Sequence, residues 1–446
     1  MTTLPPSQAT GFKARNDSTL ARQAMQYNGS ESPSGWSIGI LRTMRSMLIV
    51  LLFLIAACGP GERPTAPPSP AIVAVDIPSR AGSLGPNLAK TGDGRAVLSW
   101  MEPDGSGYAL KYAIRDGSRW TDPVTVSRGE NWFVNWADFP SVVPIDGDFW
   151  AAHWLVRRPA GGYAYDIHVA ISNDGGQSWT GGERPHRDDT DSEHGFVTIF
   201  PDAGYAGLVW LDGRRTVSSG DDTMRSMTLR AARLSRDQAL SGQTELDTMI
   251  CDCCQTDVAV TPDGPVAVYR DRSESEIRDI YSVHRDDDQW LAGEAVAQDG
   301  WKIAGCPVNG PVVASHDDDI AVAWFTAADD VPRVRLARSR ISQRSFSMPV
   351  DVAGVDTIGR VGLLLMEDGK AIVSSLRSNG DGAADLLLTP VSASGRVGAA
   401  TTLATGVAAY SVPQIIRQGD ELLAVWTERR GERSVLAGAR LPLAAL

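Results

Sequence analysis

A short apolar run that ends in an aromatic residue recurs along the chain, and this repeat limits the fold more than any other feature of the sequence. The runs lie 51 to 59 residues apart, and their last residues are Trp100, Trp154, Trp210, Tyr269, Trp324, Ser375 and Trp426. Each run follows a polar turn, and another short alternating run follows it after a second turn. Short strands repeated at this period, without helical periodicity, are typical of the blades of a β-propeller.

Counting the repeats gives seven units. We therefore expect an all-β fold, a β-propeller of seven four-stranded antiparallel blades, with six blades and one irregular unit as the alternative. A lone four-stranded sheet cannot bury both faces, so the blades must pack radially. The last unit stops after its third strand, whereas the segment 71–77 (AIVAVDI) precedes the first unit. We expect this segment to complete the last blade and close the ring.

The segment before the repeats has the pattern of an export signal. Residues 47–57 read MLIVLLFLIAA, which is too short to span a bilayer as a stable helix but suits the apolar part of a signal peptide. Arg42 and Arg45 precede it, and the residues IAAC at 55–58 resemble the lipobox of bacterial lipoproteins. The resemblance implies lipidation of Cys58. The alternative is an ordinary signal peptide or a short anchor with an incidental cysteine.

On this interpretation the chain has three parts. These are an upstream segment with the signal peptide (1–57), a Pro-rich tether (58–70) and the propeller (71–446). Acyl chains on Cys58 would hold the protein on a membrane surface without a spanning helix. We expect a cell-envelope location, on the outer membrane or its periplasmic face, with the membrane as a partner.

One turn carries a family motif. Residues 172–179 read SNDGGQSW and match the Asp-box pattern at Ser172, Asp174, Gly176 and Trp179, directly after the third strand of a unit. From about residue 71 onward the chain therefore resembles the sialidase (Asp-box) superfamily of β-propellers. The resemblance implies a structural role for the box: the Asp caps backbone amides, the Gly adopts a positive φ, and the Trp is buried.

The unusual residues collect in loops that antiparallel pairing puts on one face of the propeller. These loops join the second strand to the third, and one blade to the next. They carry the candidate ligand-face residues Trp136, Asp138, Trp301, Lys302 and Arg360, together with the candidate cysteines, arginines and acids named below. Function concentrates on loops, so we expect a binding site at the channel mouth on this face.

The overall charge narrows the class of partner. The formal net charge is −12 and no basic run stands out. A nucleic-acid groove would need a Lys/Arg stripe, so we expect no nucleic-acid binding. The expected partners are a glycan, an anionic small molecule or another protein, and we expect a monomer.

Four cysteines beyond Cys58 form two groups before neighbouring blades. Cys251, Cys253 and Cys254 belong to CDCC, and Cys306 begins CPVNGP. The set CDCCQT, YRDR, EIRDIY and GCPVNGP also resembles a group of uncharacterised sialidase-like bacterial lipoproteins. In an oxidising envelope we favour a disulfide between the two groups, which would join adjacent blades. The alternatives are a copper or zinc site that also uses His194, although C-x-C-C lacks the usual C-x-x-C zinc spacing, and a redox-active thiol.

The sialidase resemblance implies three arginines that hold a substrate carboxylate, a Tyr–Glu nucleophile pair and an Asp acid/base. Candidates lie on the expected face, and catalysis of glycoside hydrolysis generally uses two carboxylates. They are Arg214, Arg270, Arg272 and Arg278, with the acids Glu193, Asp212 and Asp271. The family's Arg-Ile-Pro signature is missing, because the corresponding segment reads SLGPNLA at 83–89. The alternative is a network of ion pairs that ties the loops together.

Three functions remain open on the sequence alone. The first is a lipid-tethered binding propeller for an anionic ligand, a glycan or a partner protein. The second is a glycoside hydrolase of the exo-sialidase type, and the third is copper or zinc handling through the four cysteines. The remaining histidines show no metal-ligand spacing, and we assign them no role: His153, His168, His186, His284 and His316.

Overall fold

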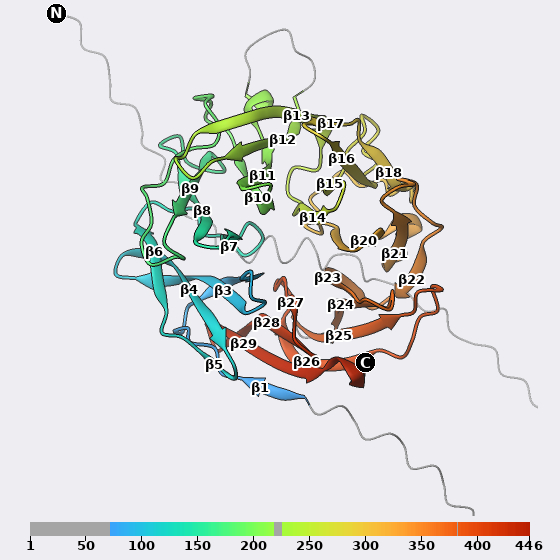
Figure 1. The fold of residues 1–446 in the computed structure, drawn as a ribbon. Helices are drawn as coiled ribbons and strands as arrows, with labels where there is room; N and C mark the ends of the chain where they lie inside the picture. Colours follow the sequence, from blue (N-terminus) through green and yellow to red (C-terminus); the bar gives the residue numbers. More distant parts are fainter. Residues whose placement is uncertain (1–71, 218–224, 381) are drawn as a thin grey trace, which may run out of the picture. The chain divides into compact units, whose positions relative to one another are not determined.

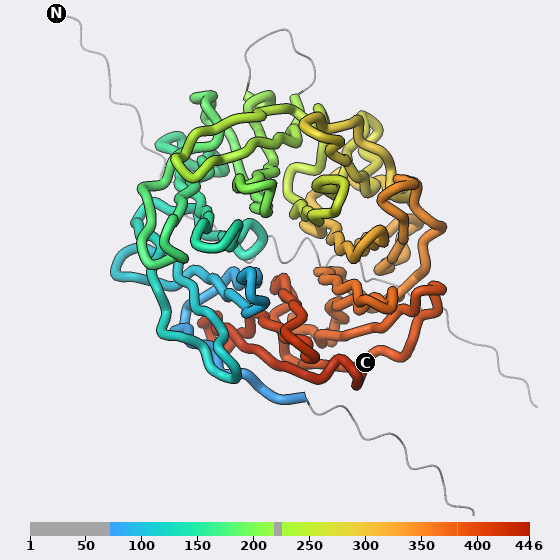
Figure 2. The backbone as a smooth tube through the Cα atoms, viewed as in Figure 1, coloured from blue at the N-terminus to red at the C-terminus, as the bar shows by residue number. Residues whose placement is uncertain are grey.

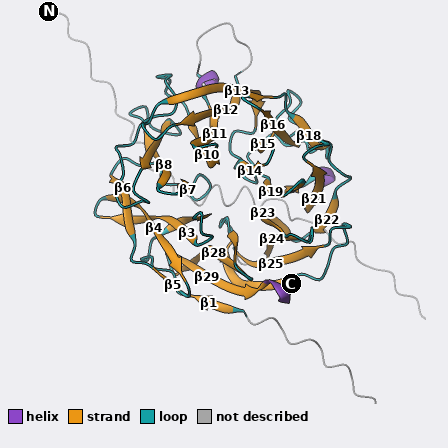
Figure 3. Ribbon diagram, viewed as in Figure 1, coloured by secondary structure: helices purple, strands orange, loops and turns teal. Residues whose placement is uncertain are grey.

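The computed structural model describes residues 72–217, 225–380 and 382–446. The expected signal segment, Cys58 and the tether lie outside these residues. Within them the chain forms strands and turns (Figure 3), and its helical residues belong to three 3₁₀ segments, η1 (Arg214–Thr216), η2 (Ala328–Asp330) and η3 (Leu443–Ala445). In these three ranges no helix has both the length and the apolar character that a bilayer crossing requires. The prediction of an all-β fold is confirmed.

The strands pair antiparallel, mostly with their neighbours in the chain. The first sheet contains β2 (Leu84–Lys90), β3 (Ala96–Asp104), β4 (Gly107–Asp116), β5 (Arg119–Trp120) and β6 (Val124–Gly129). The second contains β7 (Ser141–Asp146), β8 (Phe149–Arg157) and β9 (Tyr165–Ser172). The third contains β10 (His194–Asp202), β11 (Tyr205–Asp212), β12 (Met227–Leu234) and β13 (Leu240–Ile250).

The same pattern continues to the C-terminus. The fourth sheet contains β14 (Asp257–Thr261), β15 (Gly264–Arg270), β16 (Ile280–Asp286), β17 (Gln289–Trp290) and β18 (Glu294–Ala297). The fifth contains β19 (Val312–His316), β20 (Asp319–Thr326), β21 (Arg333–Arg340) and β22 (Val350–Ala353). The last contains β23 (Thr357–Leu365), β24 (Ala371–Ser378), β25 (Ala383–Val391), β26 (Thr401–Ala408), β27 (Gln414–Gln418), β28 (Glu421–Arg430), β29 (Arg433–Pro442) and β1 (Val73–Val75).

The recurring apolar runs of the sequence form the second strand of each repeat. In β3, β11 and β20 almost every residue is buried, so these strands lack the alternation of a half-exposed strand. A strand covered on both faces by packed layers has to be apolar at successive positions. The tryptophans that end these runs are buried, and Trp100, Trp210 and Trp324 are among the largest fully buried side chains.

The sheets are arranged around a common centre, and the chain passes round it in sequence order (Figure 1). The first strand of each repeat contacts the first strand of the next, and the last of them contacts β2 again: β2, β7, β10, β14, β19, β23 and β27. This radial arrangement of antiparallel sheets is that of a β-propeller.

The start of the described chain pairs with its end. In Figure 2 the first described residues run beside the C-terminal strands. β1 is antiparallel to β29, with Val73 opposite Arg440 and Val75 opposite Gly438. β29 is the third strand of its repeat, so β1 occupies the position of a fourth.

Several sheets depart from the expected four strands, because the first and the fourth contain five and the last contains eight. The second sheet contains three strands, and an isolated bridge between Val169 and Glu183 stands where a fourth strand would be. After this bridge the segment 184–193 leaves the sheet edge, because its side chains make a cluster of ion pairs between the second and third sheets. This cluster is described with the candidate site.

The residues of the predicted Asp box form a hydrogen-bonded turn after β9. The Ser172 hydroxyl donates to Asp174 Oδ1 (2.7 Å), and the Ser178 N–H donates to the same carboxylate oxygen (2.9 Å). Hydrogen bonds from the Ser178 hydroxyl and backbone lower the pKa of Asp174 to about 2. Gly176 has a φ of 88°, and its carbonyl accepts from Trp179 and from Tyr112 of the first sheet. The turn therefore also joins two sheets.

A buried ion pair joins the third and fourth sheets. Asp202, at the end of β10, accepts hydrogen bonds from Arg285 on β16 and from Arg233 on β12, the latter at 2.8 Å. The Asp202 and Arg285 side chains are only 2% and 8% exposed. Burial alone would raise the pKa of Asp202, but the hydrogen bonds from the two guanidinium groups hold it below its usual value.

We expect Asp202→Asn to lower the free energy of unfolding by about 3 kcal/mol, because it leaves a buried guanidinium without its counterion. The pKa of Asp202 is lowered in the folded state, so its contribution is present above about pH 4 and is lost as the pH falls. Urea unfolding of the wild type and the variant between neutral and acid pH measures both effects. Asp288→Asn is the matched control, because Asp288 also binds Arg233 but is 84% exposed. Equal losses from the two variants would contradict this account.

Candidate functional site

A cavity of about 250 Å³ lies at the centre of the propeller. The first strand of every repeat contributes to its lining. Loops that precede these strands add Ala137, Asp138, Gln255 and Asn309 to the lining, and Arg360 joins it from β23. Gln255 crosses between these loops, because its amide donates to the carbonyl of Ala137 (2.7 Å) and accepts from the N–H of Gly310 (3.2 Å).

Arg360 is the unusual member of this lining. Its backbone has a φ of 57°, which is uncommon for a residue with a side chain, and its N–H donates to Asn309 Oδ1 (2.9 Å). Its guanidinium lies over the ring of Trp136 at 4.8 Å, and Tyr410 lies next to this ring. Arg360 Nε and Nη1 are buried and have no hydrogen-bond partner. Burial lowers the pKa of Arg360 to about 10, so the group is still a cation at neutral pH.

Asp138 belongs to a second group, in which two carboxyls contact one phenol. Tyr165 Oη lies 2.8 Å from Asp138 Oδ2 and 2.7 Å from Glu193 Oε1. Burial raises the pKa of Asp138 to about 7 and that of Glu193 to about 8. The phenol has one proton to donate, so near neutral pH a protonated carboxyl must donate to the phenol oxygen in return. Sequence reasoning missed Tyr165, because a tyrosine that begins an apolar strand has the pattern of a core residue.

Arg270, a candidate substrate ligand, instead holds the backbone. It is buried, and its guanidinium donates to the carbonyls of Asn309, Arg278 and Phe325 at 2.7 to 3.0 Å. Its positive charge also lies 4.9 Å from the ring of Trp301. These contacts connect the loops of neighbouring sheets, and they occupy the group that a substrate carboxylate would need.

The other three candidate arginines are engaged with acidic side chains. Arg214 binds Asp212 (2.6 Å) and Asp188 (3.1 Å). Arg272 contacts Asp252 (3.2 Å) and Glu276 (2.6 Å), and Arg278 also binds Glu276 (2.9 Å). Arg272 and Arg278 thus share one carboxylate, Arg214 binds a different pair of acids, and each of the three is already engaged, so they do not form a free three-arginine clamp.

The remaining candidates lie apart from the cavity. Asp271 is half-buried directly after β15, where burial and the charge of Asp247 raise its pKa to about 7. Trp301 is not a ligand-face residue, because it is 6% exposed and packs edge-on against Phe325 in the apolar core. Lys302 is exposed. Of the five candidate ligand-face residues, Asp138 and Arg360 line the cavity and Trp136 packs against Arg360.

The predicted disulfide between the two cysteine groups is confirmed as Cys253–Cys306. Cys253 lies in the loop between β13 and β14, and Cys306 lies between β18 and β19. The bond therefore joins the loops that lead into the fourth and fifth sheets.

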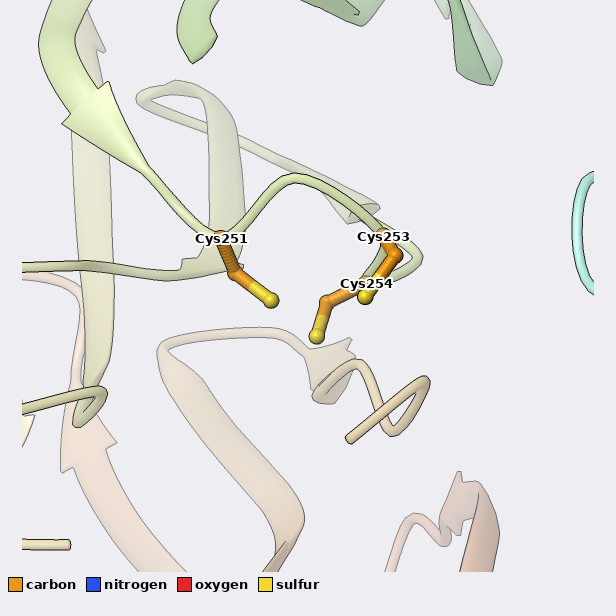
Figure 4. A group of neighbouring side chains, drawn as sticks. All are labelled: Cys251, Cys253 and Cys254. Atoms are coloured by element: carbon orange, nitrogen blue, oxygen red, sulfur yellow. The ribbon is translucent and has the colours of Figure 1, made fainter. Parts of the chain in front are cut away.

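Cys251 and Cys254 remain as buried thiols beside this disulfide. Figure 4 shows their sulfur atoms pointing toward one another, and both lie within 4.8 Å of the sulfur of Cys253. Burial raises the pKa of Cys254, whereas at Cys251 the hydrogen bond with Cys254 and the charges of Arg270 and Arg278 outweigh burial and lower the pKa to about 7. The two thiols have C-x-x-C spacing, so the statement that this run lacks such spacing was wrong.

His194 does not lie with the cysteines, which corrects its expected place in a thiolate metal site. Its ring stacks on His186 with centroids 3.9 Å apart, and both rings are buried. Asp188 lies on one side of the pair and Asp166 on the other, and Asp212 lies 3.8 Å from His194 Nε2. His186 shows no metal-ligand spacing in the sequence and was assigned no role. The segment 184–193 nevertheless brings it into this cluster.

Comparison with known proteins gives a fold and no family. No family model and no curated protein matches the sequence. Among solved structures, an ulvan lyase from a new polysaccharide lyase family is 9% identical with a TM-score of 0.52, over 82% of this chain and 95% of that chain. A protein of unknown function from Dyadobacter fermentans is 15% identical, with a TM-score of 0.47 over 83% and 97% of the two chains. An α-L-arabinanase from Penicillium chrysogenum is 14% identical, with a TM-score of 0.45 over 84% and 98%. At these identities the likeness concerns the fold alone.

We expect Cys253→Ser to lower the free energy of unfolding by roughly 4 kcal/mol, because the disulfide closes a loop with a sequence separation of 53. Cys306→Ser should lower the free energy of unfolding by the same amount. The double variant should lower it no further, since both changes break the same disulfide. Urea unfolding measures the losses. Alkylation of the unfolded, unreduced protein should label Cys251 and Cys254 and leave Cys253 and Cys306 unlabelled. Additive losses, or alkylation of Cys306, would contradict the pairing.

Proposed function

We propose that this chain is a monomeric, lipid-anchored protein of the cell envelope whose sialidase-like propeller binds an anionic glycan at the channel mouth. One observation carries the proposal. The Arg360 guanidinium lines the central cavity with two buried nitrogen atoms that have no partner. A buried cation without hydrogen bonds is costly, and a ligand carboxylate would supply two parallel hydrogen bonds and the opposite charge.

We further propose that the propeller has seven blades and that β1 closes it. Seven first strands contact one another in cyclic order, and the pairing of β1 with β29 supports this count. Closure by a strand from the other end of the chain would fix the ring, because neither end can then leave without breaking a sheet. The lipobox resemblance of IAAC at 55–58 supports lipidation of Cys58.

The surroundings of Arg360 favour a sugar acid over a small inorganic anion. Trp136 and Tyr410 place aromatic rings beside the cation, and such rings offer flat apolar surface to a sugar ring. The cavity lining itself adds the polar side chains Gln255 and Asn309. A polyuronate is therefore the probe class of choice.

We expect Arg360→Gln to weaken the binding of an oligogalacturonate at least about tenfold, because a charged hydrogen bond contributes roughly 1.5 to 3 kcal/mol. Isothermal titration of the full-length protein measures the affinity. Lys302→Gln removes an exposed positive charge from the same face and should leave affinity unchanged. A neutral galactan oligosaccharide should not bind detectably. Equal binding by wild type and Arg360→Gln would reject the proposed site.

Binding should also weaken as the pH rises from about 6 to 8. The pKa of Asp138 is raised to about 7 and that of Glu193 to about 8, so Asp138 loses most of its protons and Glu193 about half of its protons in this interval, and their charge repels an anionic ligand. Asp138→Asn should flatten much of this dependence while Arg360 remains charged. Oligogalacturonate titrations across this range provide the measurement, and an affinity that rises with pH would contradict it.

A glycoside hydrolase of the sialidase type is the second candidate, because Tyr165 and Glu193 form a hydrogen-bonded pair with Asp138 beside them. The binding role is better supported, since Tyr165 is fully buried and its pKa is raised well above the usual value by burial and two acidic neighbours. Such a phenol is a poor nucleophile.

We therefore expect fluorogenic sialoside and other glycoside reporters to remain intact when they are incubated with the protein. Release of the fluorophore by the wild type, lost in Glu193→Gln, would favour the hydrolase. Arg270→Ala is unsuitable for this test, because the loss of its bonds to three backbone carbonyls would disturb the fold.

A further inference from the structure

The cluster between the second and third sheets contains polar atoms that its own hydrogen bonds do not satisfy. His186 Nε2 and both ring nitrogens of His194 are buried without a hydrogen-bond partner. The two histidines are 2% and 0% exposed, so both side chains are buried. Native proteins seldom leave buried polar side chains unpaired, and an ion is one of the recognised explanations.

The unpaired nitrogens point to carboxylates at a characteristic distance. Asp166 Oδ1 lies 3.6 Å from His186 Nε2 and 3.8 Å from His194 Nδ1. These separations are too long for hydrogen bonds. They are close to the spacing of about 3.4 Å between two ligands on a tetrahedral zinc ion with bonds near 2.1 Å. All three ligand atoms lie within 4.8 Å of one another.

We infer that Asp166, His186 and His194 form a binding site for a divalent transition-metal ion, with Zn²⁺ the best match. Imidazole nitrogens with a carboxylate oxygen suit zinc, whereas magnesium and calcium prefer oxygen ligands alone. Because the two rings are parallel within 3°, one ring must turn about its Cβ–Cγ bond for both lone pairs to meet the ion. Asp188 contacts both rings at 3.2 Å and orients them from the opposite side.

Arginines surround the carboxylates of this cluster. Three carboxylates, those of Asp166, Asp188 and Asp212, converge on the two rings. Arg158 binds Asp166 at 3.0 Å, and Arg214 binds Asp188 and Asp212. Arg184 also contacts Asp166 (3.5 Å), and Arg230 lies 3.9 Å from Asp212. Charge balance therefore gives no separate argument for a cation, and the inference rests on the unpaired ring nitrogens.

The position of the site indicates its purpose. Asp166 lies on β9 next to Tyr165, and His194 begins β10 next to Glu193. The metal would therefore hold together the segment 184–193 and the ends of two strands that carry the Tyr165–Glu193 pair beside the cavity. We infer a structural site that also positions this pair.

Metal binding to the full-length protein tests the inference. Protein stripped with EDTA and dialysed should take up stoichiometric Zn²⁺, with a rise in the melting temperature. Co²⁺ in its place should give d–d absorption bands without the charge-transfer band of a thiolate ligand. His186→Gln should weaken zinc binding at least about tenfold, because even second-shell changes cost that much.

Two controls separate this site from other histidines and from the thiols. His168 lies on β9, the strand that carries Asp166, but it is half-buried and outside the cluster. His168→Gln should therefore leave zinc binding unchanged. The double variant Cys251→Ser, Cys254→Ser should also leave zinc binding unchanged. A folded wild-type protein that takes up no zinc would overturn the inference, whether or not His186→Gln folds. Zinc binding that is lost only in the cysteine variant would move the site to the thiols and overturn it equally.

Discussion

The rest of this structure depends on strands that are buried on both faces. The second strand of each repeat is apolar at successive positions, and it is covered only if a sheet packs on either side of it. That requirement arranges the sheets radially and brings their first strands around one cavity. The antiparallel pairing then gathers the loops before the first strands at one end of the cavity. Arg360, Asp138 and the cysteine loops meet because the sheets must cover one another.

The loops at this end are held by contacts that connect neighbouring sheets. The disulfide Cys253–Cys306 joins the loops before β14 and β19. Arg270 adds hydrogen bonds to the backbone carbonyls of Asn309, in the next loop, and Phe325, on β20. Most of the charged residues on this face serve such contacts. Arg360 differs from them because its Nε and Nη1 atoms are buried and have no hydrogen-bond partner.

The sequence predicted the fold well, because the fold follows from local patterns. Apolar runs at regular spacing predict buried strands, and their polar turns predict where each strand ends. A disulfide between the loop 251–254 and Cys306 was also predicted, since the phase within the repeat puts both loops on the same face, but the sequence did not say which of the three cysteines pairs with Cys306. The sequence could not assign the charged residues in this way. Whether an arginine binds a substrate, a carboxylate or a carbonyl depends on distances of a few ångströms between distant segments, and Arg270 and Arg360 have no local signal that separates them.

His186 was missed because the path of the segment 184–193, rather than any spacing, brings it to His194. The C-x-x-C pair within CDCC was visible in the sequence and was overlooked.

The central claim is that the unpaired guanidinium of Arg360 receives the acidic group of a ligand. A crystal structure of the protein with a bound oligogalacturonate tests it most directly. The account predicts a uronate carboxylate within hydrogen-bond distance of Arg360, with a sugar ring beside Trp136. A carboxylate bound elsewhere on the propeller, with Arg360 paired to a side chain of its own chain, would contradict it.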